Sequence, residues 1–214
     1  MTAAFGPAEV QQSGNIAPET LDRLKLFVAV LQDWNSRHNL VSAASLEDVW
    51  KRHIWDSAQL VDLVPPEAKS LVDLGSGAGF PGLILAILLR ERPGFRTVLY
   101  EATRKKSEFL AAAADASGVA VEIRNARIED AQPEPFDIVS ARACAPLDRL
   151  LLYAQAFQGP HTINLFLKGQ SVGAELTDAH KIWIMRVQER RSRSDPSGTI
   201  LIVDQLQPKA GRRA

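Results

Sequence analysis

Residues 71–82 read Leu-Val-Asp-Leu-Gly-Ser-Gly-Ala-Gly-Phe-Pro-Gly, and this stretch decides the fold. A hydrophobic segment containing Asp73 precedes four glycines within eight residues, and an apolar run follows. Glycine lacks a Cβ, so its backbone can take positive φ and a ligand can approach it closely. Such a turn between a strand and a helix lies at the carboxyl edge of a parallel sheet, where α/β proteins bind nucleotide-like ligands. We therefore expect a nucleotide-like cofactor at this turn.

The chain after residue 70 alternates between short apolar segments and helical periodicity. Two further extended segments flank a turn marked by Pro196 and Gly198. This alternation predicts an α/β fold of the Rossmann-like type, with a seven-stranded, mainly parallel sheet that ends in a β-hairpin. We expect strands over 70–74, 96–101, 119–124, 135–140 and 162–167, helices over 80–91, 104–117, 146–157 and 171–180, and the hairpin over 182–189 and 199–205.

The first 66 residues differ from this pattern. We expect residues 1–17 to form a loose leader and residues 18–66 to form an N-terminal helical cap. One helix should begin at Pro18, and a second should begin at Ser45 in a capping box with Asp48. The main domain is then expected over 67–207, followed by a basic tail over 208–214.

Composition excludes several classes of protein. The 214 residues carry 25 Lys+Arg and 25 Asp+Glu, so net charge alone does not drive this chain onto nucleic acid. A single cysteine, Cys144, rules out an internal disulfide. We see neither a secretory signal nor a run long enough to span a bilayer, so we expect a cytoplasmic protein, without membrane attachment and monomeric.

The glycine turn could serve either of two cofactors. Gly77 to Gly82 matches the dinucleotide fingerprint G-x-G-x-x-G, which is weak evidence alone. Asp73 would repel a pyrophosphate but suits an ammonium group, and the chain has no room for the substrate domain that dehydrogenases append. S-adenosylmethionine, which has an ammonium group and a sulfonium but no phosphate, therefore fits better than NAD.

Carboxylates near the strand ends supply the other expected contacts with this cofactor. We expect Asp73, Gly75 and Gly77 to hold its amino-acid end and Glu101 to accept hydrogen bonds from the ribose hydroxyls. Ile128 and Glu129 should border the adenine. The alternatives are that Glu101 is a solvated strand end and that Glu129 with Asp130 forms an acid pair at a helix N-terminus.

Six motifs in order resemble one known family, the RsmG-type (GidB-type) bacterial methyltransferases, from about residue 20 to residue 204. The resemblance implies a class I S-adenosylmethionine-dependent methyltransferase that modifies guanine N7 in 16S ribosomal RNA. It also implies that the RNA substrate is part of the small ribosomal subunit or its precursor. Two positions depart from the family: Glu101, where many members carry Asp, and Cys144, where they often carry an aromatic or branched residue. The motifs are Trp34-Asn35 with His38-Asn39-Leu40, Arg52 to Ser57, Asp73 to Gly82, Lys105-Lys106 with Phe109-Leu110, Ser140 to Ala143, and Leu167 to Gly169.

The resemblance also implies particular cofactor contacts. These fall at Gly75 and Phe80, at Glu101, Ala102 and Thr103, at Ile128 and Glu129, and at Arg142.

Guanine N7 has an exposed lone pair, so its methylation is a displacement that needs positioning and no general base. Arg142 and Lys168, each expected at a strand end, are our candidates for the residues that bind the RNA. The alternatives are a structural ion pair for Arg142 and a solvated strand end for Lys168. His53 and Asp56, three residues apart on one helix face, can touch each other, and we expect them to pack the helix or anchor a loop. The alternative is that they orient the substrate. We expect no metal site.

Basic residues cluster late in the chain. If they share a face with one another and with Arg104 to Lys106, they supply a phosphate-binding surface; otherwise they are solvated surface. Other functions stay open: a methyltransferase on another RNA, a protein or a small molecule, an NAD-dependent oxidoreductase, or a module that docks on ribosomes without catalysis. The late cluster comprises Arg186, Arg190, Arg191, Arg193, Lys209, Arg212 and Arg213.

Overall fold

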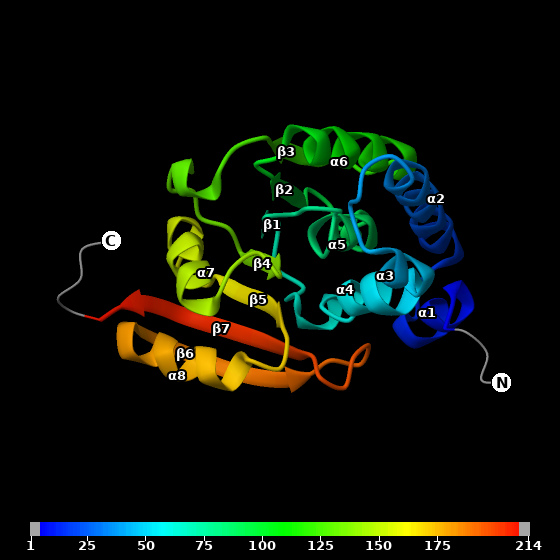
Figure 1. Cartoon of the computed structure of the whole chain (residues 1–214). Coiled ribbons are helices and arrows are strands. Elements are labelled where there is room, and N and C mark those ends of the chain that lie inside the picture. The colour runs from blue at the N-terminus through cyan, green and yellow to red at the C-terminus, as the bar shows by residue number, and fades with distance from the viewer. Residues whose placement is uncertain (1–4, 210–214) are drawn as a thin grey trace.

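The computed structural model describes residues 5–209, and its centre is a seven-stranded sheet in the order β3-β2-β1-β4-β5-β7-β6 (Figure 1). Neighbouring strands among β1 to β5 run parallel, whereas β7 is antiparallel to both β5 and β6. The predicted fold class, a mainly parallel sheet ending in a hairpin, is therefore confirmed. The strands are β1 (Ser70–Leu74), β2 (Arg96–Tyr100), β3 (Glu122–Arg124), β4 (Ile138–Arg142), β5 (Ile163–Lys168), β6 (Trp183–Arg191) and β7 (Thr199–Pro208).

Two strands begin three residues later than predicted. β3 is half as long as expected, and β4 begins at Ile138 instead of residue 135. The amides of Glu134 and Phe136 donate to the carbonyls of Ala156 and Phe157, which follow the helix after β4. These backbone groups are thus satisfied outside the sheet, and the strand starts only after them.

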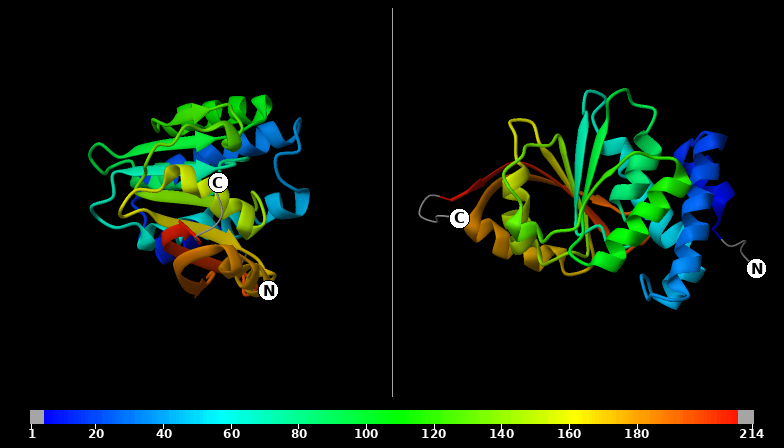
Figure 2. Two further views of the ribbon diagram at one scale, coloured as in Figure 1. Left: turned by 90° about the vertical axis from the view of Figure 1, so that its left-hand side faces the viewer. Right: turned by 90° about the horizontal axis from the view of Figure 1, so that it is seen from above.

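Helices cover both faces of the sheet (Figure 2). α7 and α8 pack on one face, whereas α5, α6 and the N-terminal helices pack on the other. Because both faces are covered, four of the five residues in each of the central strands β1, β2 and β4 are buried, as expected for a parallel sheet. The helices of the main domain are α5 (Gly82–Leu89), α6 (Arg104–Ser117), α7 (Leu147–Ala154) and α8 (Val172–Ile182).

The N-terminal region is more ordered than its sequence suggests. The prediction of a loose leader is wrong for residues 7–14, which form α1 (Pro7–Gly14). The Gly6 amide donates to the Glu9 carboxylate at 2.8 Å, and Val10 is fully buried. α1 thus packs its one buried residue, Val10, into the core, while residues 1–4 lie outside the described part of the chain.

The cap after α1 contains one long helix and a broken one. α2 (Pro18–Asn35) begins where predicted, but the second helix does not begin at Ser45. The Ser42 side chain accepts a hydrogen bond from the Ser45 amide at 3.2 Å, so Ser42 is the N-cap. The segment then divides into α3 (Ala43–Glu47), a π-helical turn (Trp50–Trp55) and α4 (Asp56–Ala58).

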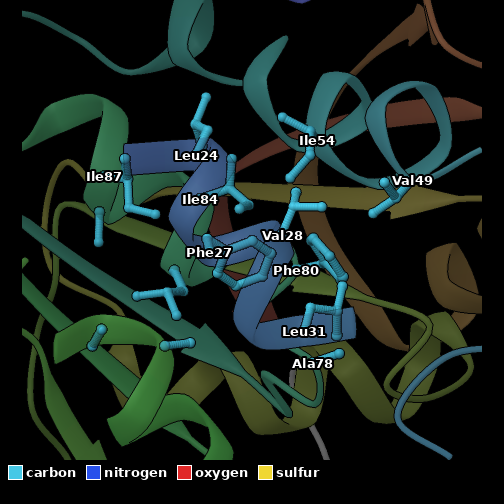
Figure 3. Close-up of a cluster of buried hydrophobic side chains, with 14 of the residues drawn as sticks. Leu24, Phe27, Val28, Leu31, Val49, Ile54, Ala78, Phe80, Ile84 and Ile87 are labelled. Atoms are coloured by element: carbon cyan, nitrogen blue, oxygen red, sulfur yellow. The ribbon is translucent and has the colours of Figure 1, made fainter. Parts of the chain in front are cut away.

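The cap and the sheet share one hydrophobic core. Leu24, Phe27 and Leu31 of α2 are fully buried against the glycine turn and α5 (Figure 3). The rings of Phe27 and Phe80 meet edge to face with centroids 5.4 Å apart. The cap therefore braces the loop after β1, and the fold couples its N-terminal helices to the carboxyl edge of the sheet.

The topology also brings the hairpin turn to this edge. β6 runs parallel to β5, since both are antiparallel to β7, and Thr199 pairs with both Lys168 and Arg191. The turn between β6 and β7 thus adjoins the ends of β4 and β5. Among residues 5–209, no helix has the length and apolar character needed to cross a membrane.

Candidate active site

Three amides of the glycine loop after β1 donate hydrogen bonds within the protein. Gly75, Gly77 and Gly79 have φ of +68°, +55° and +87°, in the left-handed region that glycine tolerates. The amide of Ser76 donates to the Tyr100 carbonyl at 2.9 Å, that of Gly77 to Glu101 Oε2 at 2.9 Å, and that of Gly79 to the Ser76 carbonyl at 2.7 Å. A phosphate binds to free amides at such a turn, so this loop is poorly suited to a dinucleotide.

Asp73 lies beneath the loop with no exposed area. Ser140 Oγ donates to its Oδ1 at 2.6 Å, while its Oδ2 lies against Gly82, where any Cβ would collide with the carboxylate. Burial raises the pKa of Asp73 to about 6, although the Ser140 hydrogen bond lowers it. The carboxylate supports the first turn of α5 from below and has no surface with which to receive an ammonium group directly.

Glu101 at the end of β2 is buried and oriented by two amides. Its Oε2 accepts from the Gly77 amide, and its Oε1 accepts from the Thr103 amide at 2.7 Å. Only 6% of Glu101 is exposed, so the alternative of a solvated strand end is wrong. Each carboxylate oxygen can accept a second hydrogen bond, which leaves capacity for a hydroxyl ligand. Ala102 is exposed beside it.

Ile128 and Glu129 occupy a single 3₁₀ turn (Ile128–Asp130) that follows β3. Glu129 Oε1 accepts a hydrogen bond from the Tyr153 hydroxyl of α7 at 2.8 Å. The Glu129 backbone amide and this hydroxyl lower the pKa of Glu129. Glu129 and Asp130 lie in the first turn of this 3₁₀ helix, so the alternative of an acid pair at a helix N-terminus is confirmed for a 3₁₀ helix.

Cys144 lies where these acidic side chains converge. A Cβ added to Gly75 would be 2.7 Å from Cys144 Sγ, so the thiol lies against the loop. Burial raises the pKa of this thiol to about 11, and the charges of Asp73, Glu101 and Glu129 act in the same direction. The thiol therefore stays protonated at neutral pH and is no nucleophile. The negative charges of these carboxylates favour a cationic ligand at this place. We call this place the acidic crevice: Asp73, Gly75, Glu101, Glu129 and Cys144.

Arg142 ends β4 and is held on three sides. Its guanidinium carbon lies 4.7 Å from the centre of the Phe80 ring, and one Nη donates to the Arg52 carbonyl at 3.2 Å. The same nitrogen is 3.7 Å from Asp56 Oδ2. Burial lowers the pKa of Arg142, and the charges of Asp56 and Asp73 oppose that effect. Phe80, expected to touch the cofactor, is itself only 3% exposed and serves mainly as this platform.

Lys168 ends β5 and is likewise paired. Its Nζ lies 2.6 Å from Glu175 Oε2 of α8 and donates to the Ala145 carbonyl at 3.2 Å. Burial acts to raise the pKa of Glu175, but hydrogen bonds from Lys168 and Ser171 outweigh it, and the pKa is lowered. Only 9% of the Lys168 side chain is exposed, so the alternative of a solvated strand end is wrong.

The two cations line one pocket, which we call the cation pocket. It encloses about 270 Å³ at the carboxyl edge, between the end of the parallel sheet and the hairpin turn. Arg142 pairs with Leu167, and Lys168 follows one position later on the adjacent strand, so both cations lie at the carboxyl ends of neighbouring strands, as the sequence predicted. Asp56, Ser192 and other polar groups complete the wall. The lining residues are Asp56, Arg142, Ala143, Leu167, Lys168, Gly169, Ser171, Glu175, Ser192, Asp195, Gly198 and Thr199.

His53 and Asp56 do not form the predicted contact. His53 stacks on Phe80 with ring centroids 4.6 Å apart, and neither of its nitrogens has a hydrogen-bond partner within the described residues. Burial lowers the pKa of His53 to about 3, and the charges of Arg142 and Arg52 add to this. The prediction assumed α-helical spacing, whereas the segment that carries His53 is π-helical.

Asp56 instead contacts the hairpin turn, a role that sequence reasoning missed. Ser194 Oγ donates to its Oδ1 at 2.5 Å and Ser192 Oγ at 3.1 Å. The residues are separated by more than 130 positions, so no local pattern signals this contact. Within residues 5–209 no group of three or more His, Cys, Asp or Glu could hold a metal ion.

The late basic residues do not share one face. Arg190 and Arg191 are neighbours on β6, and successive strand residues point to opposite sides of a sheet. Arg186 pairs with Asp204, and Arg193 pairs with Asp62 at 2.5 Å. Arg190 and Arg191 are nevertheless exposed at the carboxyl edge beside the cation pocket. Arg104 to Lys106 begin α6 at the same edge, whereas Arg212 and Arg213 lie outside the described residues.

Comparison with solved structures identifies the fold of this chain. The O-methyltransferase from Bacillus cereus, solved in complex with SAH, superposes with a TM-score of 0.58 at 16% identity, over 83% of this chain and 90% of that one. A TehB-like SAM-dependent methyltransferase from Corynebacterium glutamicum gives a TM-score of 0.56 at 15% identity, over 85% of this chain and 99% of that one. The chain therefore has the fold of the S-adenosylmethionine-dependent methyltransferases.

Sequence comparison defines the family. The model of the family described as "GidB: rRNA small subunit methyltransferase G" matches residues 20–195. The ribosomal RNA small subunit methyltransferase G of Parvibaculum lavamentivorans is 50% identical over 200 residues, which cover 92% of this chain and 88% of that protein. The chain belongs to the small-subunit rRNA methyltransferase G family, as the motifs predicted.

Proposed function

We propose that this protein transfers a methyl group from S-adenosylmethionine to N7 of a guanine in 16S ribosomal RNA. The observation that carries the proposal is the acidic crevice. Its carboxylates converge beside a glycine loop whose Ser76, Gly77 and Gly79 amides are already bonded. A sulfonium donor without phosphate suits that environment, whereas NAD does not.

The residues of the acidic crevice fit this donor. Glu101, fixed by two amides, offers its remaining lone pairs to the ribose hydroxyls. Gly75 and Gly77 permit close approach of the backbone. Ala102 and Thr103 border the ribose, and Ile128 with Glu129 borders the adenine. Asp73 acts from beneath the loop, through its charge or a water, because it has no exposed area.

The cation pocket suits the guanine and its phosphates. S-adenosylmethionine, when bound, would supply an electrophilic methyl group. Guanine N7 would take this group as the bond between sulfur and the methyl carbon breaks, leaving a neutral thioether and a cationic methylguanine. Because N7 carries no proton, the chain needs no general base. The protonated Cys144 thiol and the buried His53, whose pKa is about 3, agree with that requirement. Arg142 and Lys168 contact guanine O6 or a phosphate, since an arginine on N7 itself would compete for the lone pair.

The RNA approaches the carboxyl edge from outside. Exposed cations on this edge are Arg190 and Arg191 beside the pocket and Arg104 and Lys105 at the start of α6, where Lys106 is half-buried. They supply phosphate contacts that the balanced net charge does not reveal. The partner is the small ribosomal subunit or its precursor, on which the enzyme acts as a monomer in the cytoplasm.

Mapping of methylguanine in ribosomal RNA tests the proposal. A strain that lacks the gene should lose one N7-methylguanine from 16S RNA, and the intact gene should restore it. The Arg142→Ala gene should not restore it. An unchanged methylation map in the deletion strain would contradict the proposal and favour a non-catalytic docking module.

A further inference from the structure

Asp56 connects the hairpin turn to Arg142. Its Oδ1 accepts hydrogen bonds from Ser194 Oγ, from Ser192 Oγ and from Gln59 Nε2 at 2.5, 3.1 and 3.0 Å. Its Oδ2 receives none of these donors and lies 3.7 Å from the Arg142 guanidinium. All three donors hold one oxygen, so the other keeps a fixed direction toward the cation.

The donors to Asp56 are themselves fixed. Gln59 is 2% exposed, donates to Ser192 Oγ at 2.9 Å and accepts from the Arg193 amide at 2.8 Å. Ser194 is 5% exposed. The turn between β6 and β7 is therefore attached to the start of α4 by a buried polar network, and a satisfied buried network specifies one arrangement.

Arg142 depends on this arrangement for its position. The Phe80 ring supports one face of the guanidinium, and the Arg52 carbonyl accepts from one nitrogen. Neither contact carries a charge, whereas Asp56 supplies one, and the side chains of Asp56 and Arg142 are only 15% and 19% exposed. An arginine fixed before the substrate arrives loses less conformational freedom on binding.

We propose that Asp56 is a positioning residue that holds Arg142 in the cation pocket, and that Ser192 and Ser194 orient Asp56. The terminal hairpin is then part of the reaction site, although it lies outside the parallel sheet. This inference rests on the proposed function, since the position of Arg142 matters only if Arg142 contacts the RNA substrate.

The experiment is a double-mutant cycle on methyl transfer to small-subunit RNA, with Asp56→Asn and Arg142→Ala made singly and together. Asp62→Asn is the matched control, because Asp62 also joins this region to the hairpin, through Arg193, but does not touch Arg142. Thermal unfolding is recorded for every variant. We expect Asp56→Asn to lower kcat by about tenfold in the wild-type background and by less than about twofold in the Arg142→Ala background. The KM for S-adenosylmethionine should stay unchanged, as should all parameters of Asp62→Asn.

Replacement of both Ser192 and Ser194 by alanine should reproduce the Asp56→Asn effect on kcat. Equal losses in the two backgrounds, or an equal loss in Asp62→Asn, would overturn the positioning role and leave the proposed function intact. A wild-type protein that transfers no methyl group to RNA would overturn the proposed function and this inference with it.

Discussion

The acidic crevice and the cation pocket lie side by side at one edge of the sheet and manage charge in opposite ways. In the crevice, Asp73 and Glu101 are buried with hydroxyl and amide donors and no ion pair. In the pocket, Arg142 and Lys168 each face a carboxylate, at 3.7 and 2.6 Å. The crevice leaves negative charge for a cation to neutralise. The cation pocket fixes the positions of Arg142 and Lys168 and still leaves some of their N–H groups free to donate hydrogen bonds to a substrate.

Arg142→Ala should produce the largest effect if the cation pocket holds the RNA. Removal of a preorganised cationic donor should slow methyl transfer by about 100-fold or more, with only a small change in melting temperature. Lys168→Ala should act in the same direction. Arg96→Ala is the matched control, because Arg96 also stacks on a phenylalanine and pairs with carboxylates, but at the opposite edge. Losses of activity that merely follow losses of stability would assign Arg142 a structural role.

Asp73→Asn should stabilise the fold above pH 6. Replacement of a charged residue by a neutral one in the cation pocket should instead destabilise it. The folded-state pKa is raised from 3.8 to about 6, so the folded protein binds this proton more tightly than the unfolded chain does. Protonated Asp73 therefore contributes to the free energy of unfolding of the wild-type protein below pH 4, and this contribution is lost as the pH rises to 6. The advantage of Asp73→Asn should grow between pH 4 and pH 7, on the order of 3 kcal/mol by denaturant unfolding.

Glu175→Gln provides the opposite case. It leaves the Lys168 ammonium without its carboxylate and should lower the unfolding free energy at pH 7 by about 1–2 kcal/mol. If both neutral replacements changed stability in the same direction, the contrast between the crevice and the pocket would be wrong.

Gly75→Ala tests how closely the crevice is packed. A left-handed alanine costs about 1–2 kcal/mol, and its Cβ would also press on Cys144 Sγ. Gly94→Ala is the control, because Gly94 has nearly the same φ, +69°, and no atom within 4 Å of an added Cβ. We expect weaker S-adenosylmethionine binding only for Gly75→Ala, with partial recovery when Cys144→Ala is added. No recovery would show that backbone strain alone is responsible.

The exposed arginines should give the smallest effect. Arg190→Ser with Arg191→Ser should flatten the dependence of log RNA affinity on log salt by about 0.7–0.9 for each phosphate that is no longer neutralised. Lys181→Ser, at the far end of α8, should not change this slope. An unchanged slope in the arginine variant would identify these residues as ordinary solvated surface.

Sequence reasoning succeeded where one segment or one topology rule decides the outcome. The short apolar segments predicted strands that helices cover on both faces. Because the ends of parallel strands meet at one edge of the sheet, Glu101, Arg142 and Lys168 were predicted to lie together there. Sequence reasoning failed where contacts between segments far apart in the sequence determine the structure. The contact between Asp56 and the turn at Ser192 has no local pattern, and α1 is ordered by burial of Val10.

Local periodicity also misled in two places. The expected contact between His53 and Asp56 assumed an α-helix where the chain forms a π-helical turn. The late arginines looked like one patch because they are close in sequence, but a strand sends Arg190 and Arg191 to opposite sides.

Calorimetric titration with S-adenosylmethionine and with NAD tests the central claim most directly. We predict that S-adenosylmethionine binds at one site per chain, that Glu101→Gln weakens this binding by about tenfold, and that NAD gives no binding heat. Binding of NAD without binding of S-adenosylmethionine would contradict the account.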